Sequence, residues 1–141
     1  MTSVRQILAG KPAVYSVTPD TKVFDALGLM AEKNVGALLV VDGERLVGIF
    51  SERDYARKVV LLGRSSRDTP VREIMSTRVV SVAPSRTAGD CMALMTEARI
   101  RHLPVLEAGR IVGVISIGDV VRSVVEEQRY TIEQLESYIQ S

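Results

Sequence analysis

The sequence predicts a mixed α/β (α+β) fold built from two copies of one β-α-β-β-α unit. Residues 14–60 and 79–125 align without a gap at an offset of 65 positions, and 18 of the 47 aligned residues are identical. Within each copy, short apolar runs alternate with a stretch whose apolar residues follow a helical period. The sequence therefore indicates an internal duplication, and both copies are expected to share one local structure.

Each copy opens with a short extended run, Val14–Val17 or Val79–Val82, which stops at a turn containing proline. A helix is expected next, because apolar residues recur at positions i, i+4 and i+7. These residues are Val23, Leu27 and Met30 in the first copy and Ala88, Met92 and Met95 in the second.

Two apolar runs joined by a tight turn follow the helix, which predicts an antiparallel hairpin. The expected strands are residues 37–41 and 46–50 in the first copy, and 102–106 and 111–115 in the second. Pro104 indicates an edge strand or an irregular one. A second helix begins at Ser51 or Ser116. A single unit of this size is marginal in stability, so we expect the two sheets to pack against each other with pseudo-two-fold symmetry and with the helices outside.

The repeat divides the chain into four segments. They are a first repeat with an N-terminal helix (1–62), a linker with a short helix (63–78), a second repeat (79–125) and a C-terminal helical extension (126–141). Short helices are expected at Val4–Leu8 and Val71–Met75, and a long one over Asp119–Ile139. An apolar stripe on the long helix suits oligomerisation. It consists of Val121, Val124, Val125, Ile132, Leu135 and Ile139.

Composition limits the possible functions. Lys and Arg number 18 against 17 Asp and Glu, and a formal charge of +1 argues against a nucleic-acid-binding protein. One cysteine, Cys91, and one histidine, His102, exclude an intrachain disulfide and a Cys-cluster or His-rich metal site. Cys91 is expected to be a small core residue. No apolar segment is long enough to span a bilayer and no secretory signal is recognisable, so a soluble, cytoplasmic protein is expected.

A motif of glycine, two apolar residues, serine, two variable residues and aspartate occurs in both copies. It reads GIFSERD at 48–54 and GVISIGD at 113–119. Serine followed three residues later by an acid fits a helix-capping box. The same helix start offers free N–H groups to a phosphate and a carboxylate to the hydroxyls of a ribose. From the residues alone, the capping and the nucleotide-binding interpretations both remain open.

Together these features resemble a tandem pair of cystathionine β-synthase (CBS) domains, called a Bateman module, of the stand-alone bacterial type. The resemblance covers about residues 3–125 and is carried by SVTP and SVAP, DALGLM and DCMALM, NVGALLVVD and RIRHLPVLE, and the two motifs above. It implies a regulatory or sensor module rather than an enzyme, without a metal or catalytic cofactor. Such a module binds adenine nucleotides (AMP, ADP, ATP or NAD) in two clefts between the repeats, forms a homodimer and signals occupancy to a partner protein.

The resemblance assigns one cleft to the second motif. Asp119 would bind the ribose and Ser116 the phosphate, while Arg101 and His102 match the position at which the family often carries basic residues for phosphate. Five further residues would surround the base: Val14, Tyr15, Val35, Gly36 and Val114.

The other cleft uses the first motif, with Asp54 for the ribose and Ser51 for the phosphate. Its counterpart of the basic pair is uncharged, Gly36 and Ala37, so Arg53 is expected to supply the positive charge. The base would contact Val79, Val80, Ile100 and Ile49. The two clefts are therefore expected to differ in affinity or ligand preference.

Other function classes stay open beside the nucleotide-binding regulator. An enzyme is disfavoured, because no nucleophile–base pair, Walker loop or GxGxxG motif is present. The second alternative is a protein-interaction module with empty clefts, in which the motifs only cap helices and the long C-terminal helix carries the function. Nucleic-acid binding is the least expected.

Overall fold

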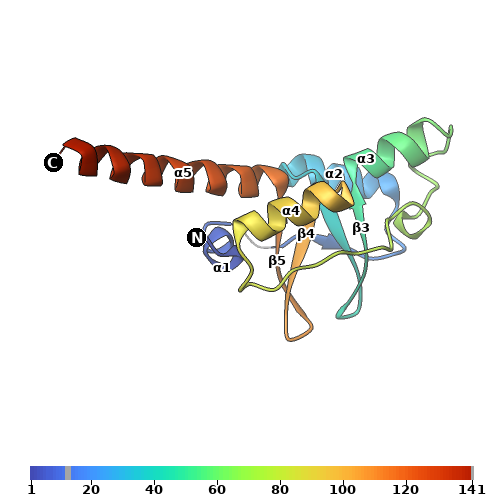
Figure 1. The fold of residues 1–141 in the computed structure, drawn as a ribbon. Coiled ribbons are helices and arrows are strands. Elements are labelled where there is room, and N and C mark those ends of the chain that lie inside the picture. The colour runs from blue at the N-terminus through green and yellow to red at the C-terminus, as the bar shows by residue number, and fades with distance from the viewer. Residues whose placement is uncertain (12–13, 141) are drawn as a thin grey trace. The chain divides into compact units, whose positions relative to one another are not determined.

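The computed structural model describes residues 1–11 and 14–140, which form two compact units (Figure 1). The middle unit spans 14–79. The terminal unit combines residues 1–13 with residues 80–141, of which 12–13 and 141 lie outside the described part. Each unit contains one copy of the repeat, and the mixed α+β fold class is confirmed.

The middle unit contains a three-stranded sheet in the order β1-β2-β3, with β1 parallel and β3 antiparallel to β2. Helices precede and follow the β2–β3 hairpin. In chain order the elements are β1 (Ser16–Val17), α2 (Val23–Lys33), β2 (Ala37–Asp42), β3 (Arg45–Ser51), α3 (Glu52–Tyr55), the π-helical turn η1 (Ala56–Val60) and the 3₁₀ turn η2 (Val71–Glu73).

The terminal unit repeats the pattern with a two-stranded sheet. Its elements are α1 (Val4–Ala9), α4 (Ala88–Ala98), β4 (His102–Glu107), β5 (Arg110–Ser116) and α5 (Ile117–Gln140). The expected first strand at Val79–Val82 is reduced to one parallel bridge between Val82 and Val105.

Pro104 explains why this ladder is so short. Val82 donates its N–H to the Pro104 carbonyl at 3.1 Å and accepts from the Leu106 N–H at 3.0 Å. The next bond toward the N-terminus would need an N–H from residue 104, which proline lacks. Leu39 holds the equivalent position of the middle unit, and there the ladder contains two residue pairs. Because β5 is the only strand in the described sheet that pairs with β4, the edge strand that Pro104 predicts is confirmed.

Helices α2 and α4 bury a face turned slightly from the predicted one. The predicted Leu27 and Met92 are only half-buried, whereas Ala26 and Cys91 are fully buried. The buried sets are Val23, Ala26 and Met30 in α2, and Ala88, Cys91 and Met95 in α4. The core position expected for Cys91 is confirmed.

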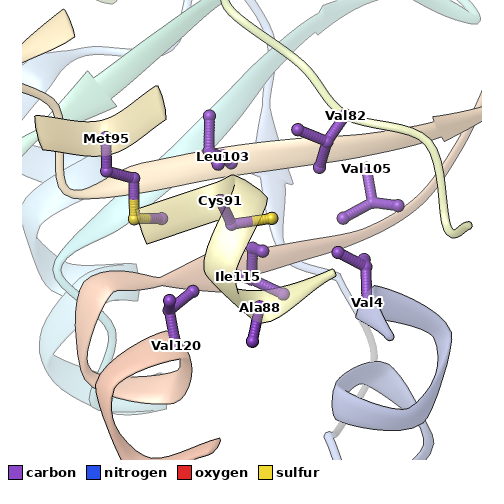
Figure 2. Close-up of a cluster of buried hydrophobic side chains, with 9 residues drawn as sticks. All are labelled: Val4, Val82, Ala88, Cys91, Met95, Leu103, Val105, Ile115 and Val120. Atoms are coloured by element: carbon purple, nitrogen blue, oxygen red, sulfur yellow. The ribbon is translucent and has the colours of Figure 1, made fainter. Parts of the chain in front are cut away.

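Each unit has its own apolar core. In the terminal unit, side chains from α1, α4, β4, β5 and α5 converge (Figure 2). They are Val4, Val82, Ala88, Cys91, Met95, Leu103, Val105, Ile115 and Val120. In the middle unit the core consists of Val23, Ala26, Met30, Leu38, Val40, Phe50, Val59, Val71 and Ile74.

The N-terminal helix belongs to the unit of the second repeat, which differs from the expected segment 1–62. Val4 of α1 is fully buried in the terminal core and donates its N–H to the Arg86 carbonyl at 2.8 Å. The matching segment before the second repeat packs on the first: Val71 is buried there and donates to the Thr21 carbonyl at 2.8 Å. Each repeat is thus completed by the short helix that precedes the other repeat in the sequence.

A strand glycine makes room for each of these short segments. A Cβ on Gly113 would lie 2.4 Å from a methyl carbon of Leu8, which follows Val4 in α1. A Cβ on Gly48 would lie 2.5 Å from the Met75 sulfur and 3.0 Å from the Ser76 carbonyl oxygen. The glycine of the repeated motif is therefore needed for close packing of strand against helix.

We predict that Gly113→Ala and Gly48→Ala each lower the free energy of unfolding by about 1–3 kcal/mol, the usual range for an overpacked core. Chemical denaturation of the purified variants measures this change. Gly28→Ala is the matched control, because nothing lies within 4 Å of a Cβ at that helical position, and it should stabilise by about 0.5–1 kcal/mol. Equal stability of all three variants would contradict the packing argument.

Candidate functional site

The repeated serine–aspartate pair caps a helix in both units. Ser116 Oγ accepts from the Asp119 N–H at 3.2 Å, and Asp119 Oδ2 accepts from the Ser116 N–H at 2.8 Å. In the middle unit, Ser51 Oγ accepts from the Asp54 N–H at 3.2 Å, and Asp54 Oδ2 accepts from the Ser51 N–H at 3.0 Å. The capping interpretation is therefore confirmed, and these reciprocal bonds fix both side chains at the junction of strand and helix.

Capping does not use all of the hydrogen-bonding capacity of these groups. A carboxylate has about four acceptor sites on its two oxygens, of which the cap occupies one or two. The aspartate side chains keep 15% (Asp119) and 16% (Asp54) of their surface exposed. Each helix start thus carries a fixed, partly solvated carboxylate that can accept from hydroxyls, while the first and third N–H groups of each helix already donate to a carbonyl and to the capping serine.

Basic residues gather around Asp119 from three parts of the terminal unit. Lys11 Nζ lies 2.5 Å from Asp119 Oδ2, and Arg122 lies 3.8 Å from Oδ1. His102 pairs with Ser116 across the β4–β5 ladder. The Arg101 carbonyl accepts from the first N–H of α5, that of Ile117, at 2.8 Å. The structure therefore brings the predicted Ser116, Asp119, Arg101 and His102 together at the start of α5.

These neighbours change the ionisation of two groups. Burial alone would raise the pKa of Asp119, but hydrogen bonds from Lys11 and Ser116 and the Lys11 charge hold it below the ordinary value. Burial lowers the pKa of His102, and the Lys11 charge lowers it further against the opposing attraction of Asp119. Asp119 is therefore anionic and His102 neutral at pH 7.

Lys11 is the functional candidate that motif analysis missed. It follows the N-terminal helix and lies more than a hundred residues from Asp119 in the sequence. One signal was available: VRQILAGK (4–11) resembles VREIMSTR (71–78), and both segments end on a basic residue. That similarity marks a basic position after each short helix, but only the fold shows which repeat the helix joins.

In the middle unit, the positive charge near the aspartate comes from a different part of the chain. The uncharged Gly36 and Ala37 replace the basic pair there, with Ala37 opposite Ser51 in the ladder and Gly36 accepting from the Glu52 N–H at 3.1 Å. A lysine on the following turn compensates in part: Lys58 Nζ lies 3.4 Å from Asp54 Oδ1 and donates to the Ile74 carbonyl at 3.1 Å. The predicted difference between the two motifs is thus visible within each unit.

The other predicted site residues are divided between the units. Val80, Ile100 and Val114 belong to the terminal unit, and the first two pack against its core. The remaining ones belong to the middle unit. They are Val14, Tyr15, Val35, Gly36, Ile49, Arg53 and Val79. The predicted clefts combine residues of both units, so their assembly stays a prediction.

The one cysteine, Cys91, is buried in the terminal unit. Burial raises the pKa of the Cys91 thiol, and the nearby Asp90 carboxylate raises it further, so this cysteine suits a core position and not a nucleophile. Residues 1–11 and 14–140 contain no group of three or more His, Cys, Asp or Glu that could hold a metal ion. Over the same ranges, no helix has both the length and the apolar character to cross a membrane.

Comparison with known proteins agrees with the fold. The family model "CBS domain" matches twice, at residues 4–61 and 71–126. A solved structure of a Burkholderia ambifaria protein with CBS domains is 57% identical, with a TM-score of 0.86 over 90% of this chain and 96% of that one. A CBS-domain containing protein from Agrobacterium tumefaciens is 37% identical, with a TM-score of 0.82 over 86% and 98%.

Two curated relatives are likewise described as CBS domain-containing proteins. CBSX3, a mitochondrial CBS domain-containing protein of Arabidopsis thaliana, is 45% identical over 87% of this chain, which spans 62% of that protein's length. YhcV of Bacillus subtilis, also a CBS domain-containing protein, is 36% identical over 84% of this chain and 83% of its own length. The two matched segments coincide with the two repeats, and the chain belongs to the CBS-domain family as a tandem pair of CBS domains.

Proposed function

We propose that this chain is a sensor module that binds adenine nucleotides (AMP, ADP, ATP or NAD) and passes its occupancy to a partner protein, without catalysing a reaction. CBS domain pairs are generally regulatory and nucleotide-binding. The observation that carries the proposal for this chain is the convergence of Ser116, Asp119, Lys11, Arg101 and His102 at the start of α5.

Each group at this position matches one part of a nucleotide. Of the first three N–H groups of the 24-residue helix α5, that of Ile117 donates to the Arg101 carbonyl and that of Asp119 to Ser116 Oγ, which leaves the Gly118 N–H and the positive end of the helix dipole for a phosphate. The free acceptor sites of Asp119 suit the two neighbouring hydroxyls of a ribose. The base would lie against Val114 and the apolar residues predicted from the first repeat. The equivalent set around Asp54 and Ser51 would form a second, less basic site.

The ion pair between Lys11 and Asp119 affects which ligands can bind at this site. While its ammonium group holds Asp119, a ribose hydroxyl has to compete for the same carboxylate oxygen. A ligand with a phosphate offers the displaced ammonium a new anion within the reach of its side chain, because Ser116 and Asp119 are hydrogen-bonded neighbours. The terminal-unit site therefore favours phosphorylated ligands over nucleosides, and its occupancy breaks the ion pair between Lys11 and Asp119.

Signalling then follows from a shift in population. A ligand changes a conformational equilibrium only as far as it binds one state better than another. In one state Lys11 is paired with Asp119, and in the other it contacts the ligand phosphate. Binding therefore favours the state in which the N-terminal segment is no longer joined to α5 by this ion pair. A homodimer of CBS pairs would transmit the change, and a solved CBS-CP12 protein of cyanobacteria that is 29% identical to this chain is hexameric. Nucleic acid is disfavoured as the partner by the formal charge of +1.

We predict that Asp119→Ala weakens AMP or ADP binding at one site by about 10- to 100-fold, the equivalent of one charge-assisted hydrogen bond of about 1.5–3 kcal/mol. Asp54→Ala should weaken the other site. Calorimetric titration of each variant measures both effects. Asp90→Ala is the matched control, since Asp90 caps α4 in the same way through Thr87 but lies outside the proposed site. Unchanged affinity in both Asp119→Ala and Asp54→Ala would refute the proposed sites.

A second prediction concerns ligand charge. Lys11→Met should raise the affinity for adenosine, since no ion pair has to be broken, and lower the affinity for ADP. The ratio of ADP to adenosine affinity at the Asp119 site should therefore fall by at least about tenfold. Arg5→Met serves as the control, because it removes a positive charge from the same helix region, where Arg5 pairs with Glu107. An unchanged ratio in Lys11→Met would exclude Lys11 from phosphate selection.

A further inference from the structure

Helix α5 exposes a row of large apolar side chains along most of its length. In Figure 1 the helix, coloured orange to red, continues well beyond α4 and the β4–β5 hairpin of its own unit. Of its residues only Val120 is fully buried. The exposed row has side chains between 39% and 80% accessible: Val121, Val125, Ile132, Leu135 and Ile139. Five exposed apolar side chains on one helix face, interrupted only by Gln128, are costly in water, which indicates a covered surface.

The spacing of the row is that of a coiled coil. From Val121 to Ile139 the intervals are four, three, four, three and four residues when Gln128 is included. This alternation is the a/d pattern of the heptad repeat, with a mean of 3.5 residues per turn. At 1.5 Å per residue the seam is about 27 Å long. A face with this period fits another helix of the same period rather than a flat surface or a small molecule.

A groove continues the seam onto the folded domain. It has a volume of about 460 Å³ and is bounded on one side by α5 and on the other by Met1, Thr87 and Gly89. The α5 residues along it are Val124, Glu127, Gln128, Thr131 and Ile132. Gly89 at the groove has no side chain, so a second helix lying on the seam gains room beside the domain. The covered surface therefore extends from the helix to the start of α4.

We propose that α5 pairs with α5 of a second copy of this chain as a parallel two-stranded coiled coil. In this register Val125, Ile132 and Ile139 occupy a, whereas the d positions are Val121, Gln128 and Leu135. β-branched residues at a combined with leucine at d favour parallel dimers. Gln128 at d is a polar residue inside the seam and lowers the stability of the pairing.

The flanking charges are compatible with the parallel arrangement. In a parallel pair each e residue faces the preceding g residue of the other helix. Arg129 then faces Val124, and Glu136 faces Thr131, so no like charges meet. An antiparallel pair over the same positions would place the two Arg129 side chains against each other at its centre. The pairing is independent of nucleotide binding and does not rest on the proposed function.

Cysteine cross-linking tests the pairing directly, because the native Cys91 is buried and gives little background. In the parallel coil the two residues at position 135 lie side by side, within the Cα separation of about 4.4–6.8 Å that a disulfide needs. Under mild oxidation of the full-length protein, Leu135→Cys should give at least tenfold more covalent dimer than the control Tyr130→Cys. Tyr130 is exposed on the same helix but lies at f, outside the seam.

Two further measurements complete the test. A mixture of Val125→Cys and Leu135→Cys proteins should give no dimer that joins the two variants, since only an antiparallel pair aligns these positions. In sedimentation velocity, Ile132→Glu should weaken self-association by at least tenfold relative to Tyr130→Glu, with helix content checked by circular dichroism. A monomeric wild-type chain, equal cross-linking at 130 and 135, or a cross-link between 125 and 135 would overturn the proposal. Tight binding of another protein to α5 in place of a second copy would also overturn it.

Discussion

The reciprocal hydrogen bonds between a serine and the aspartate three residues later fix the end of each hairpin and the start of the next helix. Because the bonds run in both directions, Ser116–Asp119 and Ser51–Asp54 hold a carboxylate and a set of backbone N–H groups in one geometry. The glycine three residues before each serine admits the short helix that completes the unit. One seven-residue motif therefore sets the packing of the domain and the shape of its candidate site.

The two units share a local backbone structure because of the duplication, but they differ in the positively charged residues around the aspartate of the motif. Around Asp119, the cations come from segments distant in the sequence: Lys11 after α1 and Arg101 just before β4. Around Asp54, the nearest cation is Lys58 on the next helical turn, which is partly committed to a backbone carbonyl. Two sites with equal acceptors but unequal cations suit a sensor that distinguishes ligands by their phosphates.

Much of this architecture could be predicted from the sequence, because the duplication repeats every local signal. The helices, the hairpins and the capping pairs follow from patterns that span fewer than a dozen residues. What sequence reasoning missed depends on long-range contacts. The packing of α1 on the second repeat and the approach of Lys11 to Asp119 join residues about a hundred positions apart, and no local pattern reports such a pairing. The sequence pattern also did not predict that Ala26 and Cys91 are fully buried in place of Leu27 and Met92. Which residues are buried depends on the rotation of each helix about its own axis against the sheet.

Calorimetric titration of the wild-type protein, freed of any bound ligand, tests the central claim most directly. With AMP, ADP, ATP and NAD in separate experiments, we expect binding in the micromolar range at up to two sites per chain. The two sites should differ in affinity, and the tighter one should respond to the number of phosphates. No heat of binding and no thermal stabilisation with any of the four ligands would contradict the account and leave a structural module in which the repeated motif serves only to cap helices.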